Sequence, residues 1–135
     1  MVEDFGSEEG STTRSILIVD DDPLVVKAMR SLLTSEGFDA LGCLTGAEAL
    51  DLADQSIAAV VLDIHLPDIN GLLLSKQLRD TLRPQAPIII LSGDSSMDTI
   101  RALPGAGATY FFSKPVNSGM LISRLKQWTL ESNAE

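Results

Sequence analysis

The stretch Ile57-Ala-Ala-Val-Val-Leu-Asp63 places one acidic residue directly after six apolar ones. A short run that is continuously apolar, rather than alternating in polarity, is typical of a strand buried on both faces, as in a parallel sheet covered by helices. In open α/β sheets, ligands bind in the crevice outside the carboxyl ends of such strands. Residues 57–62 therefore predict a central strand, and Asp63 is a candidate functional residue.

Four more apolar or β-branched segments occur along the chain, and each of the five predicted strands is followed by a stretch with helical spacing of its apolar residues. This alternation predicts an α/β domain in which one parallel sheet has helices on both faces. The predicted strands span residues 16–19, 38–44, 57–62, 88–91 and 109–112. The predicted helices run from Pro23 to before Gly37, from Thr45 through Ala53, along the stripe Leu74, Leu78 and Leu82, from Ser96 to Leu103, and from Asn117 or Ser118 onward.

Several helix ends are marked by residues that cap or interrupt a helix. Asp22 precedes a proline and suits the N-cap position of the first helix. Thr45 and Glu48 have the spacing of a capping box. Pro104 is expected to end or distort the helix over 96–103, because proline cannot donate to the helical hydrogen-bond ladder.

The chain has the length of one domain, with 135 residues of which 44% are hydrophobic and 21% charged. Residues 1–14 contain four acidic side chains and few apolar ones, so we predict a flexible segment there. The folded domain is predicted over 15–131, followed by a short tail over 132–135. A single domain of ordinary globular composition excludes a disulfide scaffold and a wholly disordered chain.

The net charge of −9 opposes binding of nucleic acid or of anionic lipid by the surface as a whole. The apolar runs are far shorter than the roughly 20 residues that a membrane helix requires. The acidic N-terminus differs from a signal peptide, and the lone Cys43 is compatible with a reducing compartment and is expected to fill space at a strand end. We therefore expect a cytoplasmic protein with no direct contact to nucleic acid or membrane.

Polar residues follow four of the five predicted strands. Asp20 and Asp21 come after the first strand, Asp63 after the third, Ser92 after the fourth and Lys114 after the fifth. Any one of them alone would be an ordinary loop residue. Because the carboxyl ends of parallel strands share one edge of the sheet, we expect the whole set to converge there.

The residue types in this set favour phosphoryl chemistry. Neighbouring carboxylates repel one another by about 1 kcal/mol per pair in water, and by more when partly dehydrated, so the cluster favours protonation or a bound cation. An all-oxygen ligand set suits Mg²⁺. A lysine and a hydroxyl group add a positive charge and a hydrogen-bond donor for phosphoryl oxygens. One carboxylate is then free to act as the nucleophile toward phosphorus.

Four runs of sequence carry a resemblance to a known family. They are ILIVDDDP at 16–23, VLDIHLPDING at 61–71, IIILSG at 88–93 and GATYFFSKP at 107–115, and in this order they resemble the receiver domain of two-component response regulators. The resemblance covers about residues 16–130. It implies a flavodoxin-like fold, which is a doubly wound five-stranded parallel sheet in the order 2-1-3-4-5 with five helices.

The resemblance also implies which residues bind the phosphoryl group and the metal ion. Asp63 would be the phosphoacceptor. Asp20 and Asp21 would hold Mg²⁺ together with Asp63, and the backbone carbonyl of His65 would add a further metal ligand. The side chain of His65 itself is expected to be solvated.

Three further positions match the family in the last two strands. Lys114 would contact the phosphoryl group, with a cis peptide bond before Pro115. Ser92 would be the switch hydroxyl, and Phe111 takes the place of the switch aromatic residue. Because this aromatic residue is often tyrosine in the family, a contact through its hydroxyl group is absent here.

The function implied is a signalling module, in which the only chemistry is phosphorylation and dephosphorylation of Asp63. The phosphoryl donor would be a histidine kinase or a phosphotransfer protein. Phosphorylation would switch the face made by the fourth helix, fifth strand and fifth helix, which would bind an output partner or domain and is also the face expected for a homodimer. Whether the receiver stands alone or belongs to a longer regulator or hybrid kinase is left open by the sequence.

Two alternatives use the same residues differently. A phosphohydrolase of the haloacid-dehalogenase type would use Asp20 as the nucleophile, with the Asp-x-Asp spacing of residues 20–22. It would also need further acidic residues after the strand that carries the lysine, and none lies near Lys114. The second alternative is an unphosphorylated scaffold, which is weakened by the presence of every predicted site residue.

Overall fold

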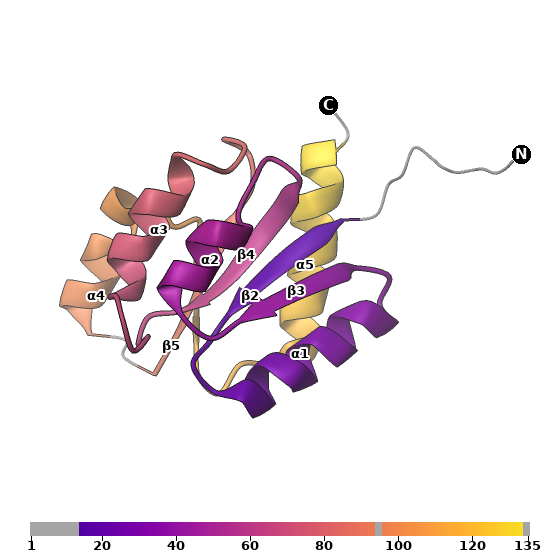
Figure 1. The fold of residues 1–135 in the computed structure, drawn as a ribbon, viewed down its shortest axis with the longest axis horizontal. Helices are drawn as coiled ribbons and strands as arrows, with labels where there is room; N and C mark the ends of the chain where they lie inside the picture. The colour runs from indigo at the N-terminus through magenta and orange to yellow at the C-terminus, as the bar shows by residue number, and fades with distance from the viewer. Residues whose placement is uncertain (1–13, 94–95, 134–135) are drawn as a thin grey trace, which may run out of the picture.

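The computed structural model describes residues 14–93 and 96–133, so most of the predicted flexible segment and the last two residues of the predicted tail lie outside the described part. The structure contains a single five-stranded sheet in the order β3-β2-β4-β5-β6, with every neighbouring pair parallel (Figure 1). In chain order this is 2-1-3-4-5, which confirms the predicted fold class. The strands are β2 (Ser15–Val19), β3 (Asp39–Cys43), β4 (Ile57–Asp63), β5 (Ile88–Ser92) and β6 (Tyr110–Ser113).

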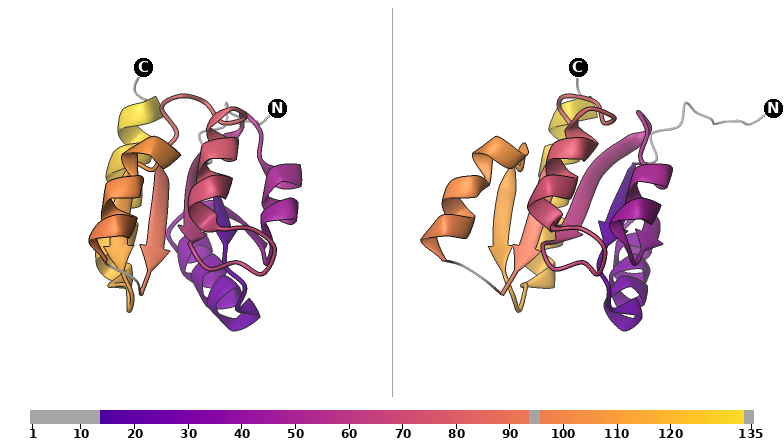
Figure 2. Two further views of the ribbon diagram at one scale, coloured as in Figure 1. Left: turned by 90° about the vertical axis from the view of Figure 1, so that its left-hand side faces the viewer. Right: turned by 60° about the vertical axis from the view of Figure 1, so that its left-hand side comes forward.

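Helices cover both faces of the sheet, as Figures 1 and 2 show. One face carries α1 (Pro23–Ser35) and α5 (Ser118–Asn133). The opposite face carries α2 (Gly46–Leu52), α3 (Gly71–Arg79) and α4 (Met97–Ala102). Helix α5 continues two residues past the predicted domain boundary at 131, since no proline or glycine follows to end it there. Among residues 14–93 and 96–133, no helix has the length and the apolar character needed to cross a membrane.

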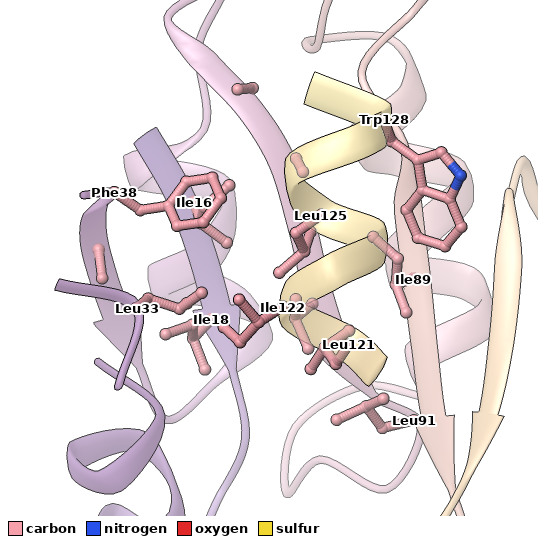
Figure 3. Close-up of a cluster of buried hydrophobic side chains, with 14 of the residues drawn as sticks. Ile16, Ile18, Leu33, Phe38, Ile89, Leu91, Leu121, Ile122, Leu125 and Trp128 are labelled. Atoms are coloured by element: carbon pink, nitrogen blue, oxygen red, sulfur yellow. The ribbon is translucent and has the colours of Figure 1, made fainter. Parts of the chain in front are cut away.

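The sheet separates two apolar cores. On the α1 and α5 side, Ile16 and Ile18 pack with Leu121 (Figure 3). On the α2 and α3 side, Leu17 packs with Leu74 in a second cluster. All seven residues of β4 are buried, as its continuous apolar pattern predicts. Because each buried aliphatic side chain contributes about 1.5–3 kcal/mol, the two cores hold the strands in register and thereby fix where their ends lie.

The predicted helix caps form, with one change of partner. Asp22 caps α1 by accepting a hydrogen bond of 3.0 Å from the N–H of Leu24. Thr45 Oγ1 accepts from the N–H of Glu48 at 3.1 Å. The Glu48 carboxylate accepts in return from Leu44 at 2.8 Å, one residue before the position that a capping box would predict.

Helix α4 is short and its end is set by a proline. It stops at Ala102, and Pro104–Ala106 forms a 3-10 turn. This confirms the expected interruption at Pro104. Helix α3 is also shorter than the predicted stripe, since it ends at Arg79 while Leu82 remains buried in the turn that follows.

The two edge strands are each covered in a different way. At the β3 edge, Nε of Arg30 donates to the carbonyl oxygen of Ala40 at 3.1 Å. At the β6 edge, the ring of Tyr110 stacks on that of Trp128 in α5, with 3.7 Å between centroids and 9° between planes. The Trp128 side chain thus packs the last helix against the sheet.

Candidate functional site

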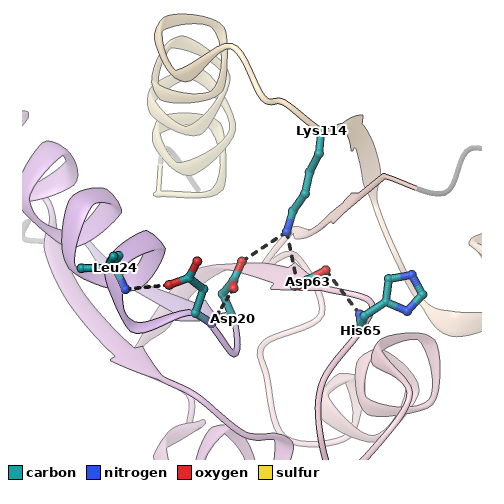
Figure 4. Close-up of polar contacts among 6 residues, drawn as sticks. Asp20, Leu24, Asp63, His65 and Lys114 are labelled. Carbon is teal, nitrogen blue, oxygen red and sulfur yellow. Dashed lines mark hydrogen bonds and ion pairs between the residues drawn. The ribbon is translucent and has the colours of Figure 1, made fainter.

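The carboxyl ends of three strands bring an acidic cluster and a lysine together. Asp20 and Asp21 follow β2, Asp63 is the last residue of β4, and Lys114 follows β6. Nζ of Lys114 lies 3.2 Å from Oδ2 of Asp63 and 3.4 Å from Oδ2 of Asp20 (Figure 4). Residues that are far apart in the chain therefore meet at one edge of the sheet, which is the arrangement that their positions after parallel strands predict.

The three carboxylates are close enough to share a ligand. Asp20, Asp21 and Asp63 each offer an oxygen, and these atoms lie within 4.8 Å of one another. Asp20 and Asp63 are buried, whereas Asp21 is exposed. Burial raises the pKa of Asp20 above its ordinary value of 3.8, although a hydrogen bond from the Asp22 N–H and the charge of Lys114 oppose the shift. The buried acids therefore carry an unfavourable excess of negative charge.

Lys114 is held in place by its main chain as well as by its charge. Its N–H donates to the carbonyl oxygen of Ser92 at 2.9 Å. The bond between Lys114 and Pro115 is cis, which confirms the predicted isomer. Partial burial would lower the pKa of Lys114, but the attraction of Asp20 and Asp63 outweighs it and raises the pKa above 10.5. The ammonium group is thus kept charged beside the carboxylates.

The two predicted switch residues lie at different depths. Ser92 is the last residue of β5 and is fully buried, next to the strand that ends in Asp63. Phe111 lies in β6 opposite Ile90 and packs, half-buried, against the core cluster on the α2 and α3 side. The structure therefore places Ser92 at the acidic edge and Phe111 farther along the neighbouring strand.

His65 contacts the predicted phosphoacceptor through its main chain. Its N–H donates to Oδ1 of Asp63 at 3.3 Å. The side chain is exposed, and Figure 4 shows the imidazole ring directed away from the carboxylates. The predicted solvated side chain is confirmed, while the metal-binding role of the His65 carbonyl stays a prediction.

The loop from Ile64 to Asn70 is closed tightly at its base. The N–H of Gly71 donates to the carbonyl oxygen of Ile64 at 2.7 Å. A Cβ atom at Gly71 would lie 2.6 Å from Cα of Ile64 and 2.7 Å from the carbonyl oxygen of Asp63. Only glycine allows this close approach, so the residue after Asn70 is fixed by the fold.

One contact at this edge was missed by sequence reasoning. Both oxygens of Asp68 accept hydrogen bonds from the first residues of α2, at 2.9 Å from the N–H of Gly46 and at 3.0 Å from that of Ala47. These bonds lower the pKa of Asp68 below its ordinary value of 3.8. Local sequence pattern contains no signal for the contact, since 22 positions separate Asp68 from Gly46.

The chemistry of the donor set fits a divalent cation. Three carboxylates and one ammonium group leave a formal charge of −2 at this edge if all are ionised. Oxygen ligands of this kind are preferred by Mg²⁺, which is typically held by one or two carboxylates and keeps several waters. The cluster of Asp20, Asp21 and Asp63 is therefore a candidate magnesium site.

Comparison with known proteins agrees with this geometry. The family described as the response regulator receiver domain matches residues 16–126. The transcriptional regulatory protein CpxR of Escherichia coli (strain K12) is 38% identical over 112 residues, which cover 82% of this chain and 47% of that protein. The chain thus spans about half the length of this curated relative.

Solved structures share the fold over nearly the whole chain. A CheY-like response regulator receiver domain protein from Methanospirillum hungatei JF-1 matches with a TM-score of 0.84 and 28% identity, covering 91% of this chain and 98% of that one. A response regulator from Burkholderia pseudomallei, solved with a phosphorylated aspartic acid, calcium ion and citrate, matches with a TM-score of 0.76 and 27% identity, covering 90% of this chain and 71% of that one. In sheet order, in sequence and in fold, the chain belongs to the response regulator receiver domain family of two-component signalling.

Proposed function

We propose that this chain is a phosphoacceptor domain in which Asp63 receives a phosphoryl group from a histidine kinase or a phosphotransfer protein. The observation that supports it most is the position of Lys114, whose ammonium group lies within 3.4 Å of both Asp63 and Asp20. A cation held between the two buried carboxylates is placed to contact a phosphoryl group on either of them. The Burkholderia pseudomallei relative, which was solved with a phosphorylated aspartic acid, supports the same chemistry.

The proposed step is an in-line displacement at phosphorus. One carboxylate oxygen of Asp63 attacks the phosphorus atom of a phosphohistidine, a P–O bond forms, and the P–N bond to the imidazole breaks. The imidazole leaves with the electron pair and takes up a proton, and Asp63 becomes an acyl phosphate. Attack of water on the same phosphorus atom later releases inorganic phosphate and restores the carboxylate. The chain thus catalyses only its own modification and recovery.

The residues around Asp63 have separate roles in this step. Lys114 contacts a phosphoryl oxygen, and Ser92 donates to another once the group is bound. Asp20 and Asp21, with Asp63 and the His65 carbonyl, would hold Mg²⁺. That ion, when bound, neutralises negative charge on the transferring group. The main-chain N–H of His65, at 3.3 Å from Asp63 Oδ1, orients the carboxylate.

Phosphorylation of Asp63 is proposed to act by changing one binding face of the domain. Ser92 and Phe111 shift inward when the phosphoryl group is present. This shift favours the active conformation of the face made by α4, β6 and α5. The phosphoryl group acts only through its preference for one state, and about 3 kcal/mol of preference changes the population ratio more than a hundredfold. That face carries exposed apolar side chains suited to an output partner or a homodimer, namely Met97, Ile100, Tyr110 and Met120. We place this activity in the cytoplasm, where histidine kinases present their phosphoryl groups.

A phosphorylation experiment tests the proposal. The chain is incubated with acetyl phosphate and Mg²⁺, and the modified residue is mapped by mass spectrometry. We expect a gain of one phosphoryl group at Asp63, lost in Asp63→Asn and kept in Asp51→Asn, which changes an exposed aspartate of α2. Label on another residue, or label that survives Asp63→Asn, would refute the assignment.

Adding Asp20→Asn to this set of variants tests the phosphohydrolase alternative. That enzyme would hydrolyse a phosphate ester with multiple turnovers and would lose activity with Asp20→Asn but not with Asp63→Asn. We expect no turnover of a phosphate ester in any variant, because the proposed donors, a phosphohistidine or acetyl phosphate, have far better leaving groups than an ester does.

A further inference from the structure

The loop that follows Asp63 is fastened to a helix from another part of the chain. The carboxylate of Asp68 spans the N-terminus of α2, with Oδ1 at 2.9 Å from the Gly46 N–H and Oδ2 at 3.0 Å from the Ala47 N–H. Thr45 Oγ1 takes the next donor, the N–H of Glu48. Two side chains thus satisfy three N–H groups that a helix start leaves without partners, and one of these side chains comes from the β4–α3 loop.

The same loop also fits α2 by shape. A Cβ atom at Gly46 would overlap Cγ2 of Ile69, so the isoleucine occupies the space that a side chain at position 46 would need. Gly46 is buried beneath it. The contact therefore combines two charge-assisted hydrogen bonds with close packing, and we call Asp68, Ile69 and Gly46 the α2 clamp.

The α2 clamp attaches the middle of this loop to α2, and an antiparallel bridge between His65 and Asn70 joins the two ends of the loop. His65, Pro67, Asp68 and Asn70 are exposed. Between them, only Leu66 and Ile69 are partly buried against the core. The hydrogen bond from Gly71 to Ile64 closes the base of the loop, and the bonds of Asp68 to α2 hold its middle. The main chain of His65 lies between these two attachments and donates to Asp63.

We propose that Asp68 is a positioning residue for the phosphorylation site, which holds the main chain of His65 in place beside Asp63 through the α2 clamp. This inference rests on the proposed function, since it assigns the His65 main chain to that site. Asp68 touches neither the carboxylates nor the lysine in any contact described above, so its effect passes through the loop. Without the clamp, the loop samples open arrangements in which the His65 carbonyl and N–H are misplaced.

The consequence is a lower apparent affinity for Mg²⁺. A ligand that binds only the closed loop has an apparent dissociation constant equal to the intrinsic value divided by the closed fraction. Loss of contacts that support metal ligands weakens metal binding about 10- to 100-fold in general. Because Asp68 acts through the loop rather than on a ligand directly, we expect the lower end of that range.

Three variants separate the clamp from the stability of α2. Asp68→Ala removes both acceptors at an exposed position, so the cores are untouched. Asp68→Asn keeps the shape and one acceptor oxygen. Thr45→Ala is the matched control, because it removes the other cap of the same helix and leaves the bonds of Asp68 intact.

The measurements are Mg²⁺ affinity by titration calorimetry without a phosphodonor, and hydrogen exchange of the His65 amide by NMR. In Asp68→Ala we expect the dissociation constant to rise about tenfold, with faster exchange of the His65 amide. Asp68→Asn should lie between this variant and the wild type, and Thr45→Ala should match the wild type in both readouts. Acetyl phosphate labelling of Asp63, at a fixed subsaturating Mg²⁺ concentration, should slow in the same order.

The outcomes distinguish the clamp from the function on which it rests. Unchanged Mg²⁺ affinity and His65 exchange in Asp68→Ala would overturn the positioning role, even if Asp63 is phosphorylated normally. Equal effects of Thr45→Ala and Asp68→Ala would overturn it too, because the cause would then be the helix. If wild-type Asp63 takes no label while the calorimetric and exchange differences persist, the phosphoacceptor function fails and the clamp stands.

Discussion

The ammonium group of Lys114 lies 3.2 Å from Oδ2 of Asp63, and the same group lies 3.4 Å from Asp20, which is 94 positions away in the chain. One partly exposed cation therefore faces two buried carboxylates, with Asp21 beside them. The edge therefore keeps a net negative charge, which an added cation would offset.

Replacing Asp63 by asparagine should stabilise the domain when no divalent cation is present. The change removes one attraction to Lys114, but it also removes repulsion from Asp20 and Asp21 and the cost of burying a charge. We expect a gain of about 1 kcal/mol in the free energy of unfolding. Urea denaturation in EDTA measures it, with Asp51→Asn as a control at an exposed position. A lower midpoint for Asp63→Asn would contradict the view that the site is overcharged.

Lys114→Met should have the opposite effect, because it leaves both buried carboxylates without their cation. Since the ammonium group is partly exposed and screened, we expect a loss of about 1 kcal/mol at neutral pH in EDTA. Added Mg²⁺ should restore more stability to this variant than to the wild type.

The pH dependence of this loss has a definite sign. The pKa of Lys114 is raised in the folded protein, so its contribution is fully present below pH 10.5 and disappears as the pH rises through the folded value. The difference between Lys114→Met and the wild type should therefore shrink in strongly alkaline buffer. A difference that stays constant through this pH range would show that the lysine acts through packing instead.

The stacked rings of Tyr110 and Trp128 should contribute to stability as a pair. Their nearly parallel rings, with centroids 3.7 Å apart, join the β6 edge to α5. Aromatic pairs contribute about 0.5–1.5 kcal/mol beyond the area they bury. A double-mutant cycle with Tyr110→Leu and Trp128→Leu, followed by urea denaturation, should give a coupling energy in this range. If the effects of the two single substitutions on the free energy of unfolding are additive, the stack contributes nothing beyond burial.

Cys43 should be unreactive in the folded domain. It is buried at the end of β3, and burial raises the pKa of its thiol to about 12. Because the thiolate is the reactive form, iodoacetamide at pH 8 should label the native protein far more slowly than the protein in urea, as mass spectrometry can show. The raised pKa also means that the unfolded state loses its proton first, so stability falls as the pH rises from 9 toward 12. Rapid native labelling would favour a redox role instead.

The sequence predicted most of the fold because its strongest patterns are local. The continuous apolar runs of β4 and β5 can be satisfied only in a sheet with two covered faces, and the structure buries both strands completely. Asp22, Thr45 and Pro104 each affect only the backbone a few residues away. Their positions therefore predict where helices begin and end. The prediction of the strand order had another source, since it followed from the family resemblance and not from any residue pattern.

Contacts between distant segments could not be predicted in this way. The bonds from Asp68 to α2 depend on how a loop lies over a helix that starts 22 positions earlier. Likewise, the stacking of Tyr110 on Trp128 requires the angle of α5 against the sheet. For the candidate site, strand ends predicted that the carboxylates and Lys114 converge, while the main-chain contact of His65 with Asp63 became visible only in the structure.

The hydrogen bond from Arg30 to Ala40 bears on the behaviour of the domain at high concentration. Asp39 and Cys43 direct their main-chain groups toward β2, so the alternation along a strand turns those of Ala40 to the open side. An outer strand with free carbonyls is a template on which a strand of another molecule can add. By occupying that oxygen, the guanidinium side chain removes one of the free acceptors that such an added strand would use.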